Sequence, residues 1–299
     1  MSSAKVMNII LSNDTVKNVM ESFLTERKAK GLAKNSLLYY MRENDLFCRW
    51  LDEKGITSIQ DLTPTIIREY LFELGKRRNS GGVHASYGAI RALLFYYENE
   101  FEPENWKNPI RKVKVQTSKL DPLKGISLEE VNTIVTACNG IHKLRDRAIF
   151  LFLASSGVRR SELVNLNVQD VDTVTGKVRI IAGKGDKNRV TFISKNAIKA
   201  LRTYLLTRNV DNEALWLNRH NERLNISTMN YLVEKYSKIT GIDFSAHDFR
   251  RCFALNCYRQ GMEILVISTI LGHYSVEVTK RYLNIGEEDL KRDYDKLKF

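Results

Sequence analysis

The chain has 299 residues, 43% of them hydrophobic and 27% charged, which is an ordinary composition for a folded protein large enough for two domains. It has no 18-residue apolar run and no secretory signal pattern, so the sequence predicts a cytoplasmic protein without a membrane partner. Its formal net charge of +12 favours a polyanionic partner, and nucleic acid fits better than a membrane surface because no basic stretch has a clean apolar face.

The first part of the chain is predicted to form four amphipathic helices. Apolar residues recur at helical spacing over 14–30, 35–54, 64–75 and 82–100. Thr63 and Pro64 mark a helix start, because threonine caps the helix and proline fits its first turn. Four short helices of this kind make a compact bundle, which we expect at 12–108.

A change in composition marks the boundary between two domains. Asn108 and Pro109 end the bundle, and the stretch up to residue 125 is basic and poor in large apolar side chains. We therefore predict a linker over 109–125. The second domain, 126–299, opens with a helix whose start at Ser127 and Glu130 has the capping-box pattern.

The second domain is predicted to be α+β, mainly helical with a small β-sheet. β-branched runs at 177–182 and 189–193 flank the sequence GKGDKN and predict a hairpin. The charged tail, 287–299, is expected to form a last helix. The other helices are expected at 145–154, 160–166, 195–207, 226–239, 248–261, 264–271 and 276–282.

Six polar residues of the second domain indicate a chemical role when they are considered together. They are Arg159, Lys184, His247, Arg250, His273 and Tyr282. Each one alone has an ordinary structural explanation: a helix cap, a solvated turn, or one of 13 tyrosines in the core or on the surface. Their order and surroundings together make a chance arrangement improbable.

These residues lie in motifs that resemble those of the tyrosine recombinase, or phage integrase, family. The motifs are GVRRSEL at 157–163, GKGDKNR at 183–189, HDFR at 247–250, LGH at 271–273 and the final Tyr282. The similarity covers the C-terminal domain, whereas the N-terminal bundle matches the family's core-binding (SAM-like) domain in architecture and size only. The resemblance implies a C-shaped clamp of two domains around DNA. One departure is Arg251, where the family commonly has histidine.

The resemblance implies that Tyr282 cleaves DNA through a covalent 3′-phosphotyrosine and that strands are exchanged through a Holliday junction. Cleavage places extra negative charge on the nonbridging phosphate oxygens, which two guanidiniums, Arg159 and Arg250, can hold by forked hydrogen bonds. A phenol with a pKa near ~10 needs a base, and His247 is the candidate. By resemblance, Lys184 protonates the leaving oxygen and His273 binds the phosphate.

Other residues are predicted to support the site, to contact DNA or to join subunits. Glu162 is expected to orient the catalytic groups by hydrogen bonding. Phosphate contacts are predicted for two basic clusters, Lys28, Lys30 and Lys34, and Lys76, Arg77 and Arg78, although a merely solvated face explains any one of them equally well. The resemblance implies a tetramer on two DNA sites, or a heterotetramer with a paralogue, with a tail that docks into a neighbouring subunit through Leu290, Tyr294 and Leu297. A tail packed on its own domain stays open.

No cofactor or metal is expected. The covalent intermediate retains the bond energy, the chain has no nucleotide-binding loop of the GxxxxGK type, and it lacks the acidic cluster of a two-metal nuclease. Its four cysteines have no zinc-like spacing and are expected to be reduced.

Two other functions remain open from the sequence. A type IB topoisomerase has similar chemistry but relaxes DNA, and a catalytically inactive DNA-binding regulator would retain only the fold. Within the recombinases, a nucleoid-associated integrase or resolvase of a mobile element is slightly favoured over Xer-type resolution of chromosome dimers. The target site and accessory proteins are not encoded in any motif.

Overall fold

The computed structural model describes residues 14–115, 125–181 and 188–283, together with Asp289, Lys291, Tyr294 and Asp295. It divides into two compact units, Met1–Asp121 and Pro122–Phe299. Each unit has its own hydrophobic core. In the described part, no helix has both the length and the apolar character needed to cross a membrane.

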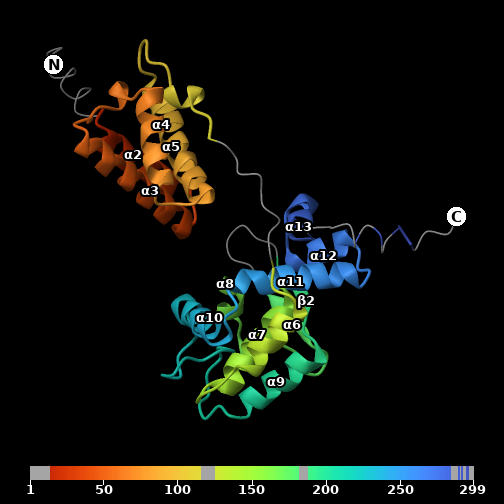
Figure 1. The fold of residues 1–299 in the computed structure, drawn as a ribbon. Helices are drawn as coiled ribbons and strands as arrows, with labels where there is room; N and C mark the ends of the chain where they lie inside the picture. The colour runs from red at the N-terminus through yellow and green to blue at the C-terminus, as the bar shows by residue number, and fades with distance from the viewer. Residues whose placement is uncertain are drawn as a thin grey trace. The chain divides into compact units, whose positions relative to one another are not determined.

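In the described residues of the first unit, four α-helices form a bundle (Figure 1). They are α2 (Val16–Ala29), α3 (Lys34–Glu53), α4 (Pro64–Gly75) and α5 (Ser80–Phe101), with short 3-10 helices at Ile59–Asp61 and Pro109–Lys112. The Thr63 side chain accepts a hydrogen bond from the amide of Ile66, and Pro64 occupies the first turn, as the sequence predicts.

The first core continues beyond the predicted end of the bundle. Ile110 and Val113 are 1% and 3% exposed and belong to the same apolar cluster as the four helices. The prediction of a linker that begins at residue 109 was therefore wrong at its start. Its composition misled because the two buried residues alternate with exposed basic ones, which hides the short apolar contact.

The second unit is mainly helical with a two-stranded antiparallel sheet, which confirms the predicted fold class. The hairpin pairs β1 (Lys177–Ile180) with β2 (Arg189–Phe192), so that Ile180 lies opposite Arg189. The helices are α6 (Leu128–Thr136), α7 (Lys143–Ser156), α8 (Arg160–Asn165), α9 (Lys195–Leu205), α10 (Ile226–Thr240), α11 (Ala246–Arg259), α12 (Ile264–Leu271) and α13 (Val276–Leu283), with a 3-10 helix at Val168–Asp170.

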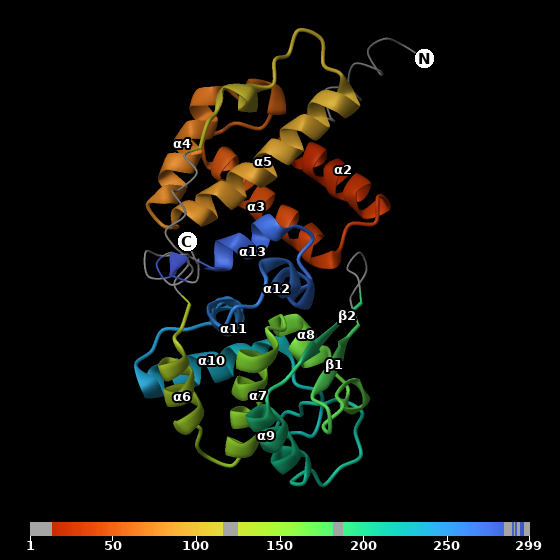
Figure 2. The same cartoon turned by 90° about the vertical axis from the view of Figure 1, so that its right-hand side faces the viewer.

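Three helices of this unit position the candidate residues. Helices α11, α12 and α13 contact one another and lie side by side in both views (Figures 1 and 2). A small apolar cluster that includes Phe253, Ile267, Leu271 and Leu283 holds them together. Hydrogen bonds from Arg250 on α11 and Arg189 on β2 to carbonyls of the last turn of α12 bring these three elements together.

Candidate active site

Two arginines meet at the C-terminal end of α12. Arg250, on α11, is 1% exposed and donates from Nη1 to the carbonyl of Gly157 and from Nη2 to the carbonyl of Leu271, each at 2.7 Å. Arg159, which precedes α8, donates from Nη2 to the carbonyl of Gly272 at 2.9 Å. The carbonyls of the successive residues Leu271 and Gly272 therefore bind one guanidinium each, which places the two arginines at the same turn.

Glycine is required at two of these positions. Gly272 ends α12 and Gly157 ends α7, with φ of 66° and 64°, in the left-handed region that residues with a Cβ avoid. A Cβ on Gly157 would also lie 2.5 Å from Cδ1 of Phe253. The glycines of the GVRRSEL and LGH motifs thus allow the close approach of the segments that hold the arginines.

Glu162 connects Arg159 to a third arginine. Its carboxylate accepts from the backbone N–H of Arg159 at 2.6 Å and from Nη1 of Arg159 at 2.8 Å. It also accepts from both Nη atoms of Arg189, at 2.6 and 2.7 Å. Burial alone would raise the pKa of Glu162, but the two arginines outweigh it and lower the pKa to about 2. The carboxylate is therefore ionised and holds the Arg159 guanidinium in one orientation.

His273 follows Gly272 and is held by one hydrogen bond. Its Nδ1 lies 2.7 Å from the hydroxyl of the fully buried Thr279. Its Nε2 is buried and has no hydrogen-bond partner among the described residues. Burial, followed by the positive charges of Arg250 and Arg159, lowers the pKa of His273 to about 4. The imidazole ring is neutral at pH 7. When Thr279 donates a hydrogen bond to Nδ1, the proton is on Nε2, and this N–H can donate a hydrogen bond to an anion.

Tyr282 lies between the two histidines. Its hydroxyl is 2.9 Å from Nε2 of His247, and its ring stacks on His273 with centroids 5.0 Å apart and an interplanar angle of 21°. Burial, Arg251 and Arg250 lower the pKa of His247, so this imidazole is neutral at pH 7 and can accept the phenolic proton. The cluster thus places a phenol, a neutral imidazole and N–H donors next to one another.

Five of the six candidates are brought together in this way, and the sixth cannot be placed. Lys184 lies outside the described residues, which omit 182–187. The strands on either side of it are described, and β2 contacts α12, whose end carries the arginine-binding turn.

The phage integrase family model matches residues 124–288, which is more than half of the chain. The chain belongs to this family. Its tyrosine recombinase XerA relative from Pyrococcus horikoshii is 31% identical over 288 residues, covering 94% of both chains. A XerC relative from Caldanaerobacter subterraneus is 32% identical and covers 93% of this chain and 86% of that one. This recombinase is accordingly a DNA breaking-rejoining enzyme of site-specific recombination, and no similarity favours the topoisomerase or the inactive regulator.

Solved structures of the family share the fold. A lambda integrase dimer bound to a COC′ core site matches 99% of this chain and 84% of its own with a TM-score of 0.74 at 16% identity. A post-cleavage complex of XerH with palindromic difH substrate matches 94% of this chain and 84% of its own, with a TM-score of 0.71 at 19% identity.

The structure distinguishes among the six basic residues predicted to contact DNA. Lys28, Lys34 and Arg77 are exposed. Lys30 pairs with Glu26, and Lys76 lies over the ring of Phe72. Arg78 differs from the rest because Nη1 donates at 2.7 Å to Glu43, a carboxylate that is 1% exposed. Glu43 also accepts from Arg42, so two arginines share this buried carboxylate, and contact of Arg78 with DNA stays a prediction.

The predicted tail contacts are only partly described. Leu290 and Leu297 lie outside the described residues, and Tyr294 is 59% exposed. Asp289 is buried and accepts from Nε of Arg259 on α11 at 3.2 Å. Through Asp289 the tail contacts its own domain, and docking into a neighbouring subunit stays a prediction.

Two residues of the site were not singled out from the sequence. Arg189 is the last residue of the GKGDKNR motif, and a charged residue at the start of a strand that packs on the core is the signal that could have identified it. Thr279 lies three residues before Tyr282 on α13, so both face the same side of the helix.

Arg251, where the family commonly has histidine, forms an ion pair with Asp248 at 2.7 Å on the first turns of α11.

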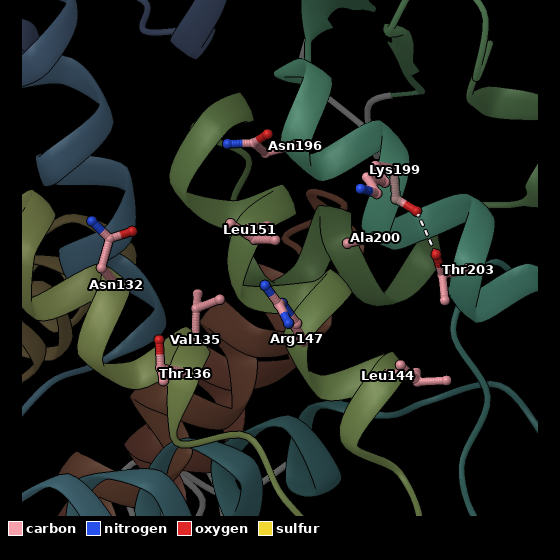
Figure 3. A pocket seen from close by; sticks show the side chains of 10 residues that line it. All are labelled: Asn132, Val135, Thr136, Leu144, Arg147, Leu151, Asn196, Lys199, Ala200 and Thr203. Carbon is pink, nitrogen blue, oxygen red and sulfur yellow. Dashed lines mark hydrogen bonds between the residues drawn. The ribbon is translucent and has the colours of Figure 1, made fainter.

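A hollow elsewhere in the recombinase lies apart from this chemistry. It has a volume of about 490 Å³ and is formed by α6, α7 and α9, with Asn132, Arg147 and Lys199 among its lining residues (Figure 3). None of the candidate catalytic residues lines it. Among the described residues, no group of three or more His, Cys, Asp or Glu side chains is arranged to hold a metal ion.

Proposed function

We propose that Tyr282 is the nucleophile with which this recombinase cleaves double-stranded DNA. The observation that carries the proposal is the 2.9 Å contact between the Tyr282 hydroxyl and Nε2 of the neutral His247, next to Arg159 and Arg250. The phenolic oxygen attacks the scissile phosphorus as its proton passes to His247, and the bond from phosphorus to the 5′ oxygen breaks. The products are a 3′-phosphotyrosine and a free 5′ hydroxyl.

The positive groups stabilise the charge that develops during this step. Arg250 uses two of its five N–H donors on backbone carbonyls, and its buried Nε has no partner in the described part of the chain. With Arg159 and Nε2 of His273, it would bind the nonbridging oxygens. Removing one preorganised donor of this kind costs about 100- to 1,000-fold in rate. We therefore expect Arg159→Ala to abolish measurable cleavage.

Rejoining is the reverse reaction with a different strand. A 5′ hydroxyl from the partner DNA attacks the phosphotyrosine and passes its proton to Lys184, which gave one up during cleavage. His247 returns a proton to the departing Tyr282 oxygen, and the phosphodiester is restored. Lys184 would donate the proton to the 5′ oxygen during cleavage. Because the covalent link preserves the energy of the broken bond, the cycle consumes no nucleotide and needs no metal.

The proposed substrate is a pair of DNA sites held by four copies of the chain. The XerH and lambda integrase structures contain DNA sites, which supports a duplex target. Relatives at 31% and 32% identity are XerA and XerC, which supports an Xer-type role over the mobile-element role that the sequence slightly favoured. A tetramer, a second recombinase as partner and accessory proteins are the assembly to test on the identified site.

A suicide-substrate assay tests the proposal. Nicked duplexes from the protein's own genomic neighbourhood are incubated with wild type and Tyr282→Phe, and covalent complexes are separated on a denaturing gel. A protein–DNA band that depends on Tyr282 would support the proposal and identify the site. Tight binding without a band would point to a chain that needs an activating partner or that does not cleave.

A further inference from the structure

The Arg189 side chain makes hydrogen bonds to residues of α8 and α12, outside the β-hairpin to which it belongs. Arg189 is the first residue of β2, and its side chain is only 7% exposed. Both Nη atoms donate to the carboxylate of Glu162, which in turn receives two hydrogen bonds from Arg159. Such a two-pronged contact fixes the plane of the carboxylate as well as its position. The orientation of Arg159 therefore depends on Arg189 through one shared anion.

The same side chain supports the turn that leads to His273. Nε of Arg189 donates at 2.9 Å to the carbonyl of Ile270, in the last turn of α12, where carbonyls lack partners within the helix. Its Cδ lies so close to Gly272 that a Cβ there would be only 2.7 Å away. Arg189 thus packs against the residue before His273 and binds the residue three before it.

We propose that Arg189 is a positioning residue that fixes the Arg159 guanidinium and the His273 turn relative to strand β2. The inference rests on the proposed function, since it assigns Arg189 to the cleavage step. Three separate motifs of the sequence meet in this one side chain: GVRRSEL through Glu162, LGH through Ile270 and Gly272, and GKGDKNR through Arg189 itself.

A structural ion pair and a positioning residue predict different losses. Loss of a structural pair lowers the melting temperature and lowers cleavage of every substrate alike. Loss of a positioning residue acts through Arg159 and His273, whose task is to bind negatively charged phosphate oxygens. Its effect should therefore shrink when the scissile phosphate is replaced by a neutral methylphosphonate, which has one charged oxygen fewer.

The variants for the test are Arg189→Met and Arg189→Lys. Methionine removes the charge and the donors, whereas lysine retains the charge but cannot make the two-pronged contact. Arg179→Met is the matched control, because Arg179 lies on the paired strand β1, is exposed, and donates at 2.7 Å to the carbonyl of Gln169. Each variant is measured for melting temperature, DNA affinity and single-turnover formation of the covalent adduct on both substrates.

We expect Arg189→Met to bind the DNA site within about threefold of wild type and to cleave the phosphate substrate about 100-fold more slowly, the loss typical of one preorganised donor. On the methylphosphonate the loss should be at least tenfold smaller, and Arg189→Lys should recover part of the phosphate rate. Arg179→Met should behave as wild type.

Three results would overturn the proposal. They are cleavage by Arg189→Met at the rate of Arg179→Met, an equal loss on both substrates, and failure of both Arg189 variants to fold, which would leave a structural role alone. A wild-type protein that forms no adduct on any substrate would instead reject the proposed function, before Arg189 is tested.

Discussion

The hydroxyl of Tyr282 lies 2.9 Å from Nε2 of His247, although the two residues are 35 positions apart in the chain. His247 is on the first turn of α11 and Tyr282 near the end of α13, and the contact between these helices brings them together. The hydrogen bond gives the phenol a neutral acceptor for its proton.

Tyr282→Phe should bind DNA as wild type does but form no covalent adduct. Phenylalanine retains the ring that stacks on His273 and loses only the hydroxyl, so the packing of α13 should persist. Gel-shift affinity and the suicide-substrate assay measure the two properties separately. A covalent band of undiminished intensity in this variant would exclude Tyr282 as the nucleophile.

The histidines of the site should titrate at unusually low pH in the DNA-free protein. Burial and the nearby arginines lower the pKa of His273 to about 4 and place the pKa of His247 below its ordinary value. NMR titration can follow all five histidines of the chain, with His247→Gln and His273→Gln for assignment. A midpoint at or above 6.5 for either residue would contradict the proposed neutral state.

The same shifts predict how stability depends on pH. A histidine whose pKa falls on folding binds protons more tightly in the unfolded state, so protonation favours unfolding. The free energy of unfolding should therefore decrease as pH falls from about 6.5 towards about 4, with His273 as one contributor. Thermal melts of wild type and His273→Gln over this range measure it, and identical pH dependence in the two proteins would reject the contribution.

Thr279→Val should slow cleavage about tenfold without weakening DNA binding. Valine has nearly the shape of threonine but no hydroxyl, so Nδ1 of His273 loses the partner that fixes which ring nitrogen carries the proton. A loss of about 1.4 kcal/mol in transition-state stabilisation corresponds to this factor. Thr279→Ser retains the hydroxyl and serves as control. Equal rates for the valine and serine variants would show that the hydrogen bond does not matter for cleavage.

The sequence predicted the fold through local signals and the site through motif order. Thr63 and Pro64, the Ser127 capping box and the left-handed Gly272 act within a few residues, so they could be predicted. The contact of Glu162 with Arg189 joins residues 27 positions apart, on α8 and β2, and so depends on tertiary packing that no spacing encodes. The short burial of Ile110 and Val113 was missed for the same reason, because the helices that cover them are distant in the sequence.

Lys184→Ala should cleave ordinary DNA slowly and a sulfur-substituted substrate well. The residue lies outside the described part of the chain, so its role as the acid rests on the family resemblance and on its place in the GKGDKNR motif. An amine is strongly basic, yet a lysine can give up its proton as the 5′ oxygen acquires negative charge in the transition state. If the bridging 5′ oxygen is replaced by sulfur, the leaving thiolate needs no proton, and the rate of the alanine variant should approach that of wild type. Arg159→Ala on the same substrate is the control, because sulfur does not replace a donor to the nonbridging oxygens. Equal slowing of Lys184→Ala on both substrates would assign the acid to another residue.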